Sequence, residues 1–286
     1  MMRALILFFT LVFVCLPVHA HKVNSKHSHK AKTEKVKRSD NTSMLVFNIN
    51  ENRHEFEVKS NVVRPIASVT KLMTAMVTLN HDRNMSKKLH IKSSVGGSLP
   101  RTKEYTRYEL LNAMLVKSDN SAAETLASDY PGGRDAFIRE MNKLAFEFNM
   151  INTNFDDPTG LSSSNTASAI DIATMVARAS EYNLIREIST KKQIEIETQY
   201  KRKIRTIVLN NTNRPVLFEF DNIVVSKTGF TNPAGYCLGL AVEKEGRKYA
   251  VVILGAKNKF DRIHRVESIM YNHLNDTSGG PKELDN

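Results

Sequence analysis

A serine and a lysine that could act as a nucleophile and its base stand three positions apart before a long apolar segment. Ser68 and Lys71 are followed by residues 72–79, which are mostly apolar and typical of a buried helix. Residues three apart share a helix face, so the Ser68 hydroxyl and the Lys71 amine can meet. A serine hydroxyl is a weak nucleophile near neutral pH, and a desolvated lysine held neutral can accept its proton. The pair therefore predicts a nucleophilic serine at a helix start, where free backbone N–H groups favour nearby negative charge.

The same Ser-x-x-Lys pattern recurs at Ser189 and Lys192, so it does not identify a catalytic site by itself. A second group, Ser118 and Asn120, falls in an expected turn between two helices. A hydroxyl and an amide at this spacing can pass a proton to a leaving amine and hold a substrate carbonyl. Helix capping is the structural alternative, and residues 39–41 and 163–165 show the same Ser-x-Asn pattern.

A third group is Lys227, Thr228 and Gly229, a combination that occurs once in the chain. It lies near the end of an expected strand, where glycine is costly unless another segment approaches the backbone closely. A cation beside a hydroxyl could receive a substrate carboxylate, while the strand edge could hydrogen-bond an extended peptide. The alternative is a strand-end turn with a solvated lysine.

The order of the three groups carries more information than any one of them. Ser-x-x-Lys, Ser-Asp-Asn and Lys-Thr-Gly, in this order, form the motif set of penicillin-binding proteins and class A β-lactamases. Here they fall on a helix start, an inter-helix turn and a strand, whereas the repeated patterns at residues 39–41 and 189–192 are out of order. The chain resembles the penicillin-recognising serine D,D-peptidases over roughly residues 43–275.

Two further stretches are similar to the low-molecular-mass D-alanyl-D-alanine carboxypeptidases and endopeptidases, namely residues 65–75 and the loop 157–161 with residues 168–171. Anchored members of that family carry an extra β-rich domain after the catalytic one. The present sequence stops without it, as in the soluble endopeptidases of the penicillin-binding protein 7 type.

The resemblance implies an α/β (α+β) fold with a five-stranded antiparallel sheet flanked by helices and an inserted all-α region. We expect residues 43–82 and 183–276 to form the sheet region and residues 83–182 the inserted region, together one catalytic domain. Residues 277–286 are expected to be a C-terminal tail.

The resemblance also assigns four catalytic roles. Ser68 would attack the carbonyl of a D-alanyl peptide bond, and Lys71 would accept its proton. Ser118 would relay a proton toward the leaving amine, and Asn120 would face the cleft beside it. No cofactor and no metal ion is expected for this acyl transfer.

Four more residues are expected to bind substrate: Lys227, Thr228, Gly229 and Phe230. Lys227 and Thr228 would receive the substrate, and the backbone N–H groups of Ser68 and Phe230 would form the oxyanion hole. The expected partners are peptidoglycan peptides, with β-lactam antibiotics as covalent inhibitors.

Composition places the chain among ordinary globular proteins, with 41% hydrophobic and 25% charged residues in 286. Residues 1–20 have a charged start, a short apolar run and a small residue at position 20, which predicts a secretory signal cleaved after Ala20. That run is too short for a comfortable transmembrane helix. We expect an exported, periplasmic protein without a transmembrane anchor.

Residues 21–42 carry seven Lys or Arg residues against Glu34 and Asp40 and almost no large apolar side chains. This composition predicts a flexible basic tail that favours anionic wall or membrane surfaces. No aromatic residues interleave with the charges, and no nucleic-acid-binding fold signature follows, which argues against DNA or RNA as a partner. The sequence does not indicate an oligomeric state.

Three alternatives to an endopeptidase stay open. The first is a D-alanyl-D-alanine carboxypeptidase that trims pentapeptides. The second is a class A-like β-lactamase, although the Glu-x-x-Leu-Asn stretch that those enzymes use for deacylation does not occur between residues 121 and 226. The third is a non-catalytic protein that only binds the cell wall.

Periodicity predicts the elements that must position these residues. Residues 43–49 and 53–58 are two strand-like runs on either side of a turn and predict a hairpin, while Thr106 and Glu109 fit a capping box. The other expected elements are helices over 135–148, 168–182 and 260–274 and strands over 194–198, 223–230, 235–242 and 248–255.

Overall fold

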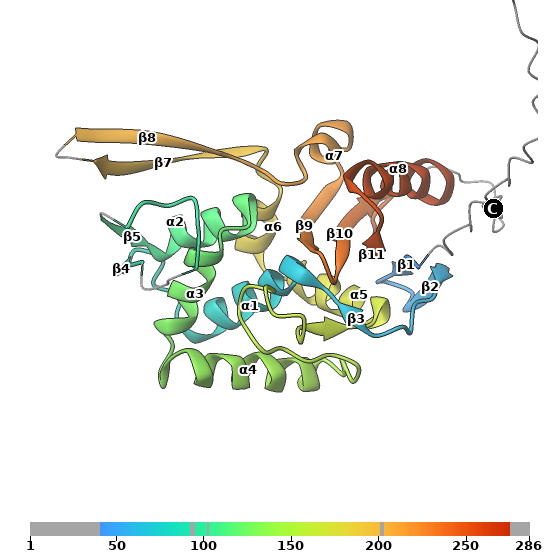
Figure 1. Cartoon of the computed structure of the whole chain (residues 1–286). Helices are drawn as coiled ribbons and strands as arrows, with labels where there is room; N and C mark the ends of the chain where they lie inside the picture. Colours follow the sequence, from blue (N-terminus) through green and yellow to red (C-terminus); the bar gives the residue numbers. More distant parts are fainter. Residues whose placement is uncertain (1–40, 92–94, 102, 201–202, 275–286) are drawn as a thin grey trace, which may run out of the picture. The chain divides into compact units, whose positions relative to one another are not determined.

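The computed structural model describes residues 41–91, 95–101, 103–200 and 203–274 (Figure 1). The expected signal peptide and most of the expected basic tail lie outside the described residues. The strands are β1 (Ser43–Asn48), β2 (Arg53–Val58), β3 (Arg64–Pro65), β4 (Lys88–His90), β5 (Glu104–Thr106), β6 (Thr166–Ala167), β7 (Gln193–Tyr200), β8 (Lys203–Asn210), β9 (Ile223–Thr231), β10 (Gly235–Lys244) and β11 (Arg247–Ala256).

The helical elements include three short segments of other hydrogen-bonding type, the 3₁₀-helix η1 and the π-helical turns η2 and η3. Their bounds are η1 (Ala67–Thr70), α1 (Lys71–His81), α2 (Arg107–Asn112), η2 (Ala113–Lys117), α3 (Asn120–Ser128), α4 (Gly133–Glu147), α5 (Ala169–Ala179), α6 (Asn183–Ser189), α7 (Arg214–Glu219), α8 (Lys259–Ile269) and η3 (Met270–Leu274).

The main sheet has five strands in the order β2-β1-β11-β10-β9, and every neighbouring pair is antiparallel. The expected five-stranded antiparallel sheet is therefore confirmed, and β9 stands at one edge. Because side chains alternate along a strand, the two faces belong to different clusters. Leu45 and Val252 join the cluster that contains α1 and α5, whereas Val46 and Val251 pack with α8.

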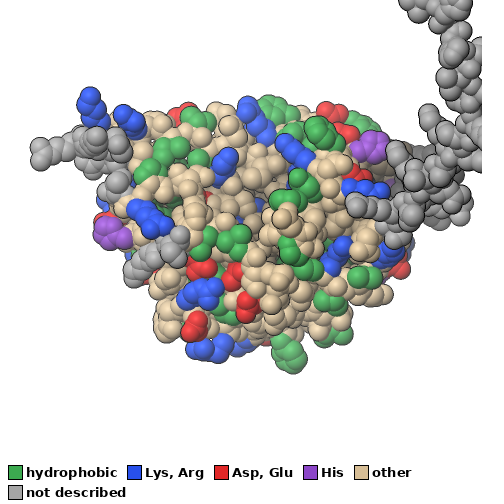
Figure 2. All heavy atoms as spheres, in the orientation of Figure 1, with side chains coloured by type: hydrophobic (Ala, Val, Ile, Leu, Met, Phe, Trp, Pro, Cys, Tyr) green, Lys and Arg blue, Asp and Glu red, His purple; other side chains and the backbone are tan. Residues whose placement is uncertain are grey.

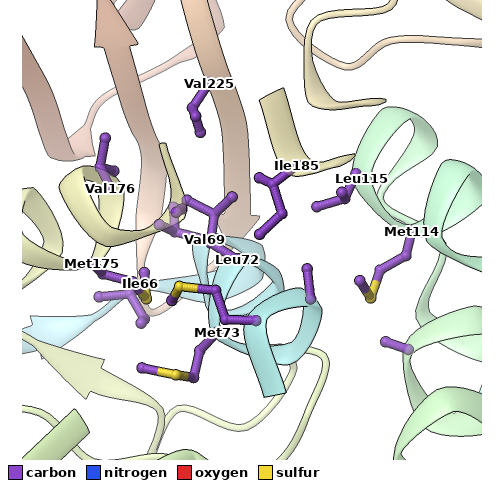
Figure 3. Close-up of a cluster of buried hydrophobic side chains, with 14 of the residues drawn as sticks. Ile66, Val69, Leu72, Met73, Met114, Leu115, Met175, Val176, Ile185 and Val225 are labelled. Atoms are coloured by element: carbon purple, nitrogen blue, oxygen red, sulfur yellow. The ribbon is translucent and has the colours of Figure 1, made fainter. Parts of the chain in front are cut away.

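Helix α1 is the buried centre of the helical region. Every side chain from Lys71 to Leu79 is buried, as expected for a helix that is apolar on all sides. Figure 3 shows Leu72 and Met73 of α1 in a cluster with residues of η2, α5, α6 and β9, including Met114 and Val225. The segment that carries Ser68 and Lys71 is thus held by elements from all parts of the described chain.

Capping residues set several helix starts as the sequence predicts. Thr106 and Glu109 form the complete capping box of α2. The side chain of Ser168 accepts the N–H of Asp171 at the start of α5, and Asp119 accepts the N–H of Ala122 at the start of α3. These bonds satisfy backbone donors that a helix leaves without partners at its N-terminus.

Several elements differ from the sequence expectations. The stretch 83–182 is mainly helical but also contains the β4–β5 hairpin and β6, so it is not all helix. Their strands have two or three residues, too few for alternation to be recognised in the sequence. The short helices α6 and α7 and the strand β8, which pairs with β7, were also not predicted.

Surface charge on the face shown in Figure 2 is mixed in sign, with Asp and Glu side chains lying among those of Lys and Arg. No helix among the described residues combines the length and the apolar character that a membrane span requires.

The close contact between β10 and α5 gives a test of the packing. A Cβ atom added to Gly239 would lie 2.8 Å from a methyl group of Val176, whose β-branched side chain has little rotamer freedom. Gly239→Ala should lower the free energy of unfolding by about 1–3 kcal/mol through overpacking, measured by urea denaturation. Gly96→Ala is the control, since an added Cβ there meets no atom within 4 Å. Equal effects of the two substitutions would contradict the packing described.

Candidate active site

The backbone at Ala67 and Ser68 is in close contact with two glycines. Ala67 has φ +48°, a left-handed conformation that alanine rarely adopts and that is often retained at functional sites. A Cβ atom on Gly160 would lie 2.0 Å from the Ala67 carbonyl oxygen, and one on Gly229 would lie 2.9 Å from the Ser68 nitrogen. Only glycine permits this approach. The Lys-Thr-Gly strand and the loop at residue 160 therefore both lie against Ser68.

The amine of Lys71 is surrounded by oxygen atoms. Its Nζ lies 2.8 Å from the Ser68 Oγ, 2.7 Å from the Asn120 Oδ1 and 2.6 Å from the Thr159 carbonyl oxygen. The Ser68 hydroxyl itself donates to the same carbonyl at 3.3 Å. The sequence predicted that Ser68 meets Lys71 and that Asn120 faces the same cleft, and in the structure Ser68 and Asn120 both contact the Lys71 amine.

Burial determines the protonation of Lys71. The side chain is fully buried, and desolvation lowers its pKa from 10.5 to about 7. The carboxylates of Asp157, Asp119 and Glu124 act in the opposite direction and raise this pKa, but less strongly. An amine with a pKa near 7 is neutral often enough near physiological pH to accept a proton.

The Thr159 carbonyl is fixed by a loop folded around Asp157. The Asp157 carboxylate accepts the backbone N–H groups of Thr159, Gly160 and Ser162 at 2.5–2.6 Å. The side chain of Asn165 then links the loop to the nucleophile segment, donating to the Asp157 carbonyl at 2.8 Å and to the Thr70 hydroxyl at 3.0 Å. The loop that holds Thr159 and the helix that holds Lys71 therefore form one bonded unit.

The Ser118 turn is equally constrained. Ser118 follows η2 and has φ +64°, so the chain reverses sharply before α3 begins. Asp119 is buried and accepts the backbone N–H of Ser98 and the Ser121 hydroxyl as well as capping α3. Capping was the structural alternative for this motif; Asp119 supplies the cap and leaves Ser118 and Asn120 half-buried.

Lys227 joins the third motif to the second. Its Nζ donates to the Ser118 Oγ at 3.0 Å and to the Thr228 carbonyl at 2.9 Å. The side chain is buried, and desolvation, reinforced by the positive charges of Lys71 and Arg262, holds its pKa well below the usual range. Lys227 is therefore not the solvated lysine of the alternative interpretation.

The predicted site residues of β9 point to different sides of the strand. Lys227 and Gly229 are directed toward Ser118 and Ser68, and the Thr228 hydroxyl donates to the Thr212 Oγ1 at 2.6 Å. Phe230 is half-exposed, and its ring lies 4.3 Å from that of Tyr236. All eight predicted site residues thus lie on three of the four segments that meet around Ser68 and Lys71, and the fourth is the loop that carries Thr159.

The second Ser-x-x-Lys pattern has a different role. Ser189 is fully buried and accepts the backbone N–H of Ser226 at 3.2 Å, while Lys192 lies 3.7 Å from Asp221. This serine supports β9 and does not meet its lysine. The sequence did not predict the contacts of two residues. Thr159 was noted only as part of the loop 157–161 that resembles the family, and no motif indicated Thr212.

A sequence model described as D-alanyl-D-alanine carboxypeptidase, peptidase family S11, matches residues 30–258. The chain belongs to this family of serine peptidases. It is 36% identical to a D-alanyl-D-alanine endopeptidase of Escherichia coli K12 over 225 residues, which is 76% of this chain and 72% of the relative. It is 34% identical to a D-alanyl-D-alanine endopeptidase of Pseudomonas aeruginosa over the same shares of the two chains.

Solved structures show the same fold. The DD-transpeptidase of Streptomyces K15 is 24% identical, with a TM-score of 0.74 over 80% of this chain and 94% of that one. Penicillin-binding protein D2 of Listeria monocytogenes, solved in its cefotaxime-bound form, is 27% identical with a TM-score of 0.70 over 80% and 95% of the two chains.

The depressed pKa of Lys71 predicts a pH-dependent stability. Between pH 7 and 10.5 the folded state binds fewer protons at this residue than the unfolded state, so the contribution of Lys71 to the free energy of unfolding rises with pH. Lys71→Met lacks this contribution. In urea denaturation across this pH window, the free energy of unfolding of the wild type minus that of Lys71→Met should increase steadily with pH. Parallel pH profiles would mean that the Lys71 pKa is not depressed in the folded protein.

Proposed function

We propose that this protein is a serine D,D-peptidase that acts on peptidoglycan, as an endopeptidase that cleaves D-alanyl cross-bridges through an acyl-enzyme on Ser68. The observation that carries the proposal is the contact of the Ser68 hydroxyl with a buried lysine of pKa about 7. The names of the bacterial relatives support the endopeptidase activity.

The hydrogen-bond partners of Lys71 determine where the lone pair of its neutral amine points. A neutral amine has two N–H bonds and one lone pair. The Thr159 carbonyl and the Asn120 Oδ1 can only accept hydrogen bonds, so they take the two N–H groups. The lone pair is then left facing Ser68 Oγ, 2.8 Å away. The Ser68 hydroxyl, which donates to the Thr159 carbonyl in the structure, would turn its proton to this lone pair and transfer it as the oxygen attacks the D-alanyl carbonyl.

Ser118 would return the proton to the leaving amine. Its Oγ accepts a hydrogen bond from the Lys227 Nζ at 3.0 Å. Lys227 and Thr228 would receive the substrate, with a carboxylate partner restoring the charge that burial disfavours on Lys227. The backbone N–H groups of Ser68 and Phe230 would stabilise the oxyanion, a contribution typically worth about 100- to 1,000-fold in rate.

We further propose a periplasmic location after cleavage of the signal peptide following Ala20, and a single catalytic domain in which residues 83–182 interrupt the sheet region. Peptidoglycan peptides are the proposed substrate and β-lactams the proposed covalent inhibitors. The basic residues of 21–42 favour association with anionic wall or membrane surfaces.

Labelling with a fluorescent penicillin tests the nucleophile. The wild type should become covalently labelled and keep the label for a long time, because the chain lacks the Glu-x-x-Leu-Asn stretch used for rapid deacylation. Ser68→Ala should abolish labelling. Ser128→Ala, in which the lost hydroxyl bonds only within α3, should label like the wild type. Label that persists in Ser68→Ala would refute the assignment, and rapid penicillin turnover by the wild type would indicate a β-lactamase.

Digestion of purified peptidoglycan separates the two peptidase activities. We expect cross-linked dimers to disappear while the stem peptides are otherwise unchanged. Chromatography of the muropeptides measures both. Removal of the terminal D-alanine from monomeric pentapeptides, with dimers intact, would instead establish the carboxypeptidase alternative. Ser68→Ala is the control for contaminating activities, and a wild type without any hydrolysis would favour a protein that only binds the wall.

A further inference from the structure

Thr212 contacts the candidate site residue Thr228, and the three motifs give it no role. It lies between β8 and α7 and is half-buried. Its Oγ1 accepts the Thr228 hydroxyl at 2.6 Å, and its backbone N–H donates to the Val116 carbonyl at 3.1 Å. Val116 belongs to η2, which leads directly into Ser118. One residue therefore bonds to the strand that carries Lys227 and to the helical segment η2 that precedes Ser118.

Both neighbours of Thr212 are anchored in the interior. The amide of Asn211 donates to the carbonyls of Ser189 and Lys191 at 3.0 and 2.8 Å. The backbone N–H of Asn213 donates to the Asn211 Oδ1 at 2.8 Å, and its amide donates to the Ser226 Oγ at 3.0 Å. Asn211 and Asn213 are buried, so the position of Thr212 is fixed by bonds that water does not weaken.

We propose that Thr212 is a positioning residue that orients the Thr228 hydroxyl for a substrate carboxylate; this inference rests on the proposed function of Thr228. In the free site the Thr228 proton is directed at the Thr212 Oγ1. When a carboxylate binds, Thr228 turns its proton to the anion, and the Thr212 hydroxyl donates to the Thr228 oxygen. A hydroxyl can both donate and accept, so Thr228 keeps a partner in both states.

Thr212→Val tests this role because valine keeps the shape and the backbone N–H but loses the hydroxyl. The second-order rate of acylation by benzylpenicillin, which carries a carboxylate, should fall by roughly tenfold, as expected for one lost hydrogen bond to a group that binds an anion. The rate of deacylation should stay within about twofold of the wild type, and Thr212→Ser should restore acylation. Thr206→Val, an exposed threonine of β8, is the matched control.

A double-mutant cycle with Thr228→Val identifies the route of the effect. If Thr212 acts through Thr228, Thr212→Val should cause no further loss of acylation in a Thr228→Val background. Independent, multiplying losses would overturn the proposal, as would wild-type acylation by Thr212→Val or failure of Thr212→Ser to restore the rate. A wild type that benzylpenicillin does not acylate at all would instead contradict the proposed function itself.

Discussion

The burial of one amine is the constraint on which the rest of the site depends. Lys71 is enclosed because α1 is buried on every side, and that enclosure lowers the pKa of the amine to about 7. A buried polar group is costly unless its hydrogen bonds are satisfied. The Thr159 carbonyl, the Asn120 amide oxygen and the Ser68 hydroxyl meet this need. The same contacts that make the lysine tolerable in the interior also aim it at the serine.

The site also depends on two positions at which no side chain fits. Gly160 and Gly229 permit two separate segments to touch the backbone at Ala67 and Ser68, where any side chain would collide. The distance between the nucleophile and its surroundings is therefore set mainly by backbone contacts, which are stiffer than contacts between flexible side chains. Lys227 links β9 to the Ser118 turn through its bond to the Ser118 hydroxyl, and burial holds the pKa of its amine well below the usual range.

Much of this architecture follows from local rules. The short apolar runs of β1, β9, β10 and β11 and the capping box at Thr106 predict their elements, because apolar runs and caps are properties of neighbouring residues. The β4–β5 hairpin is too short to show a period, and the exposed Ile204 and Val208 give β8 no clear apolar face. The three motifs identify the site's side chains, but a backbone acceptor such as the Thr159 carbonyl has no residue type that marks it. Thr212 was missed for a related reason, since its importance comes from tertiary contacts alone.

The four segments that meet at Ser68 are distant in sequence, and this separation has a kinetic consequence. The Lys71 amine bonds to residues 49 and 88 positions away, and Lys227 reaches a serine 109 positions away. Contacts of such long range form slowly because closing a long loop costs conformational entropy before the contact stabilises the chain. The proposed nucleophile, Ser68, would therefore have the reactivity of an ordinary alcohol until these segments have come together. Acylation of Ser68 would therefore report that the domain has folded, and a partly folded chain would not react.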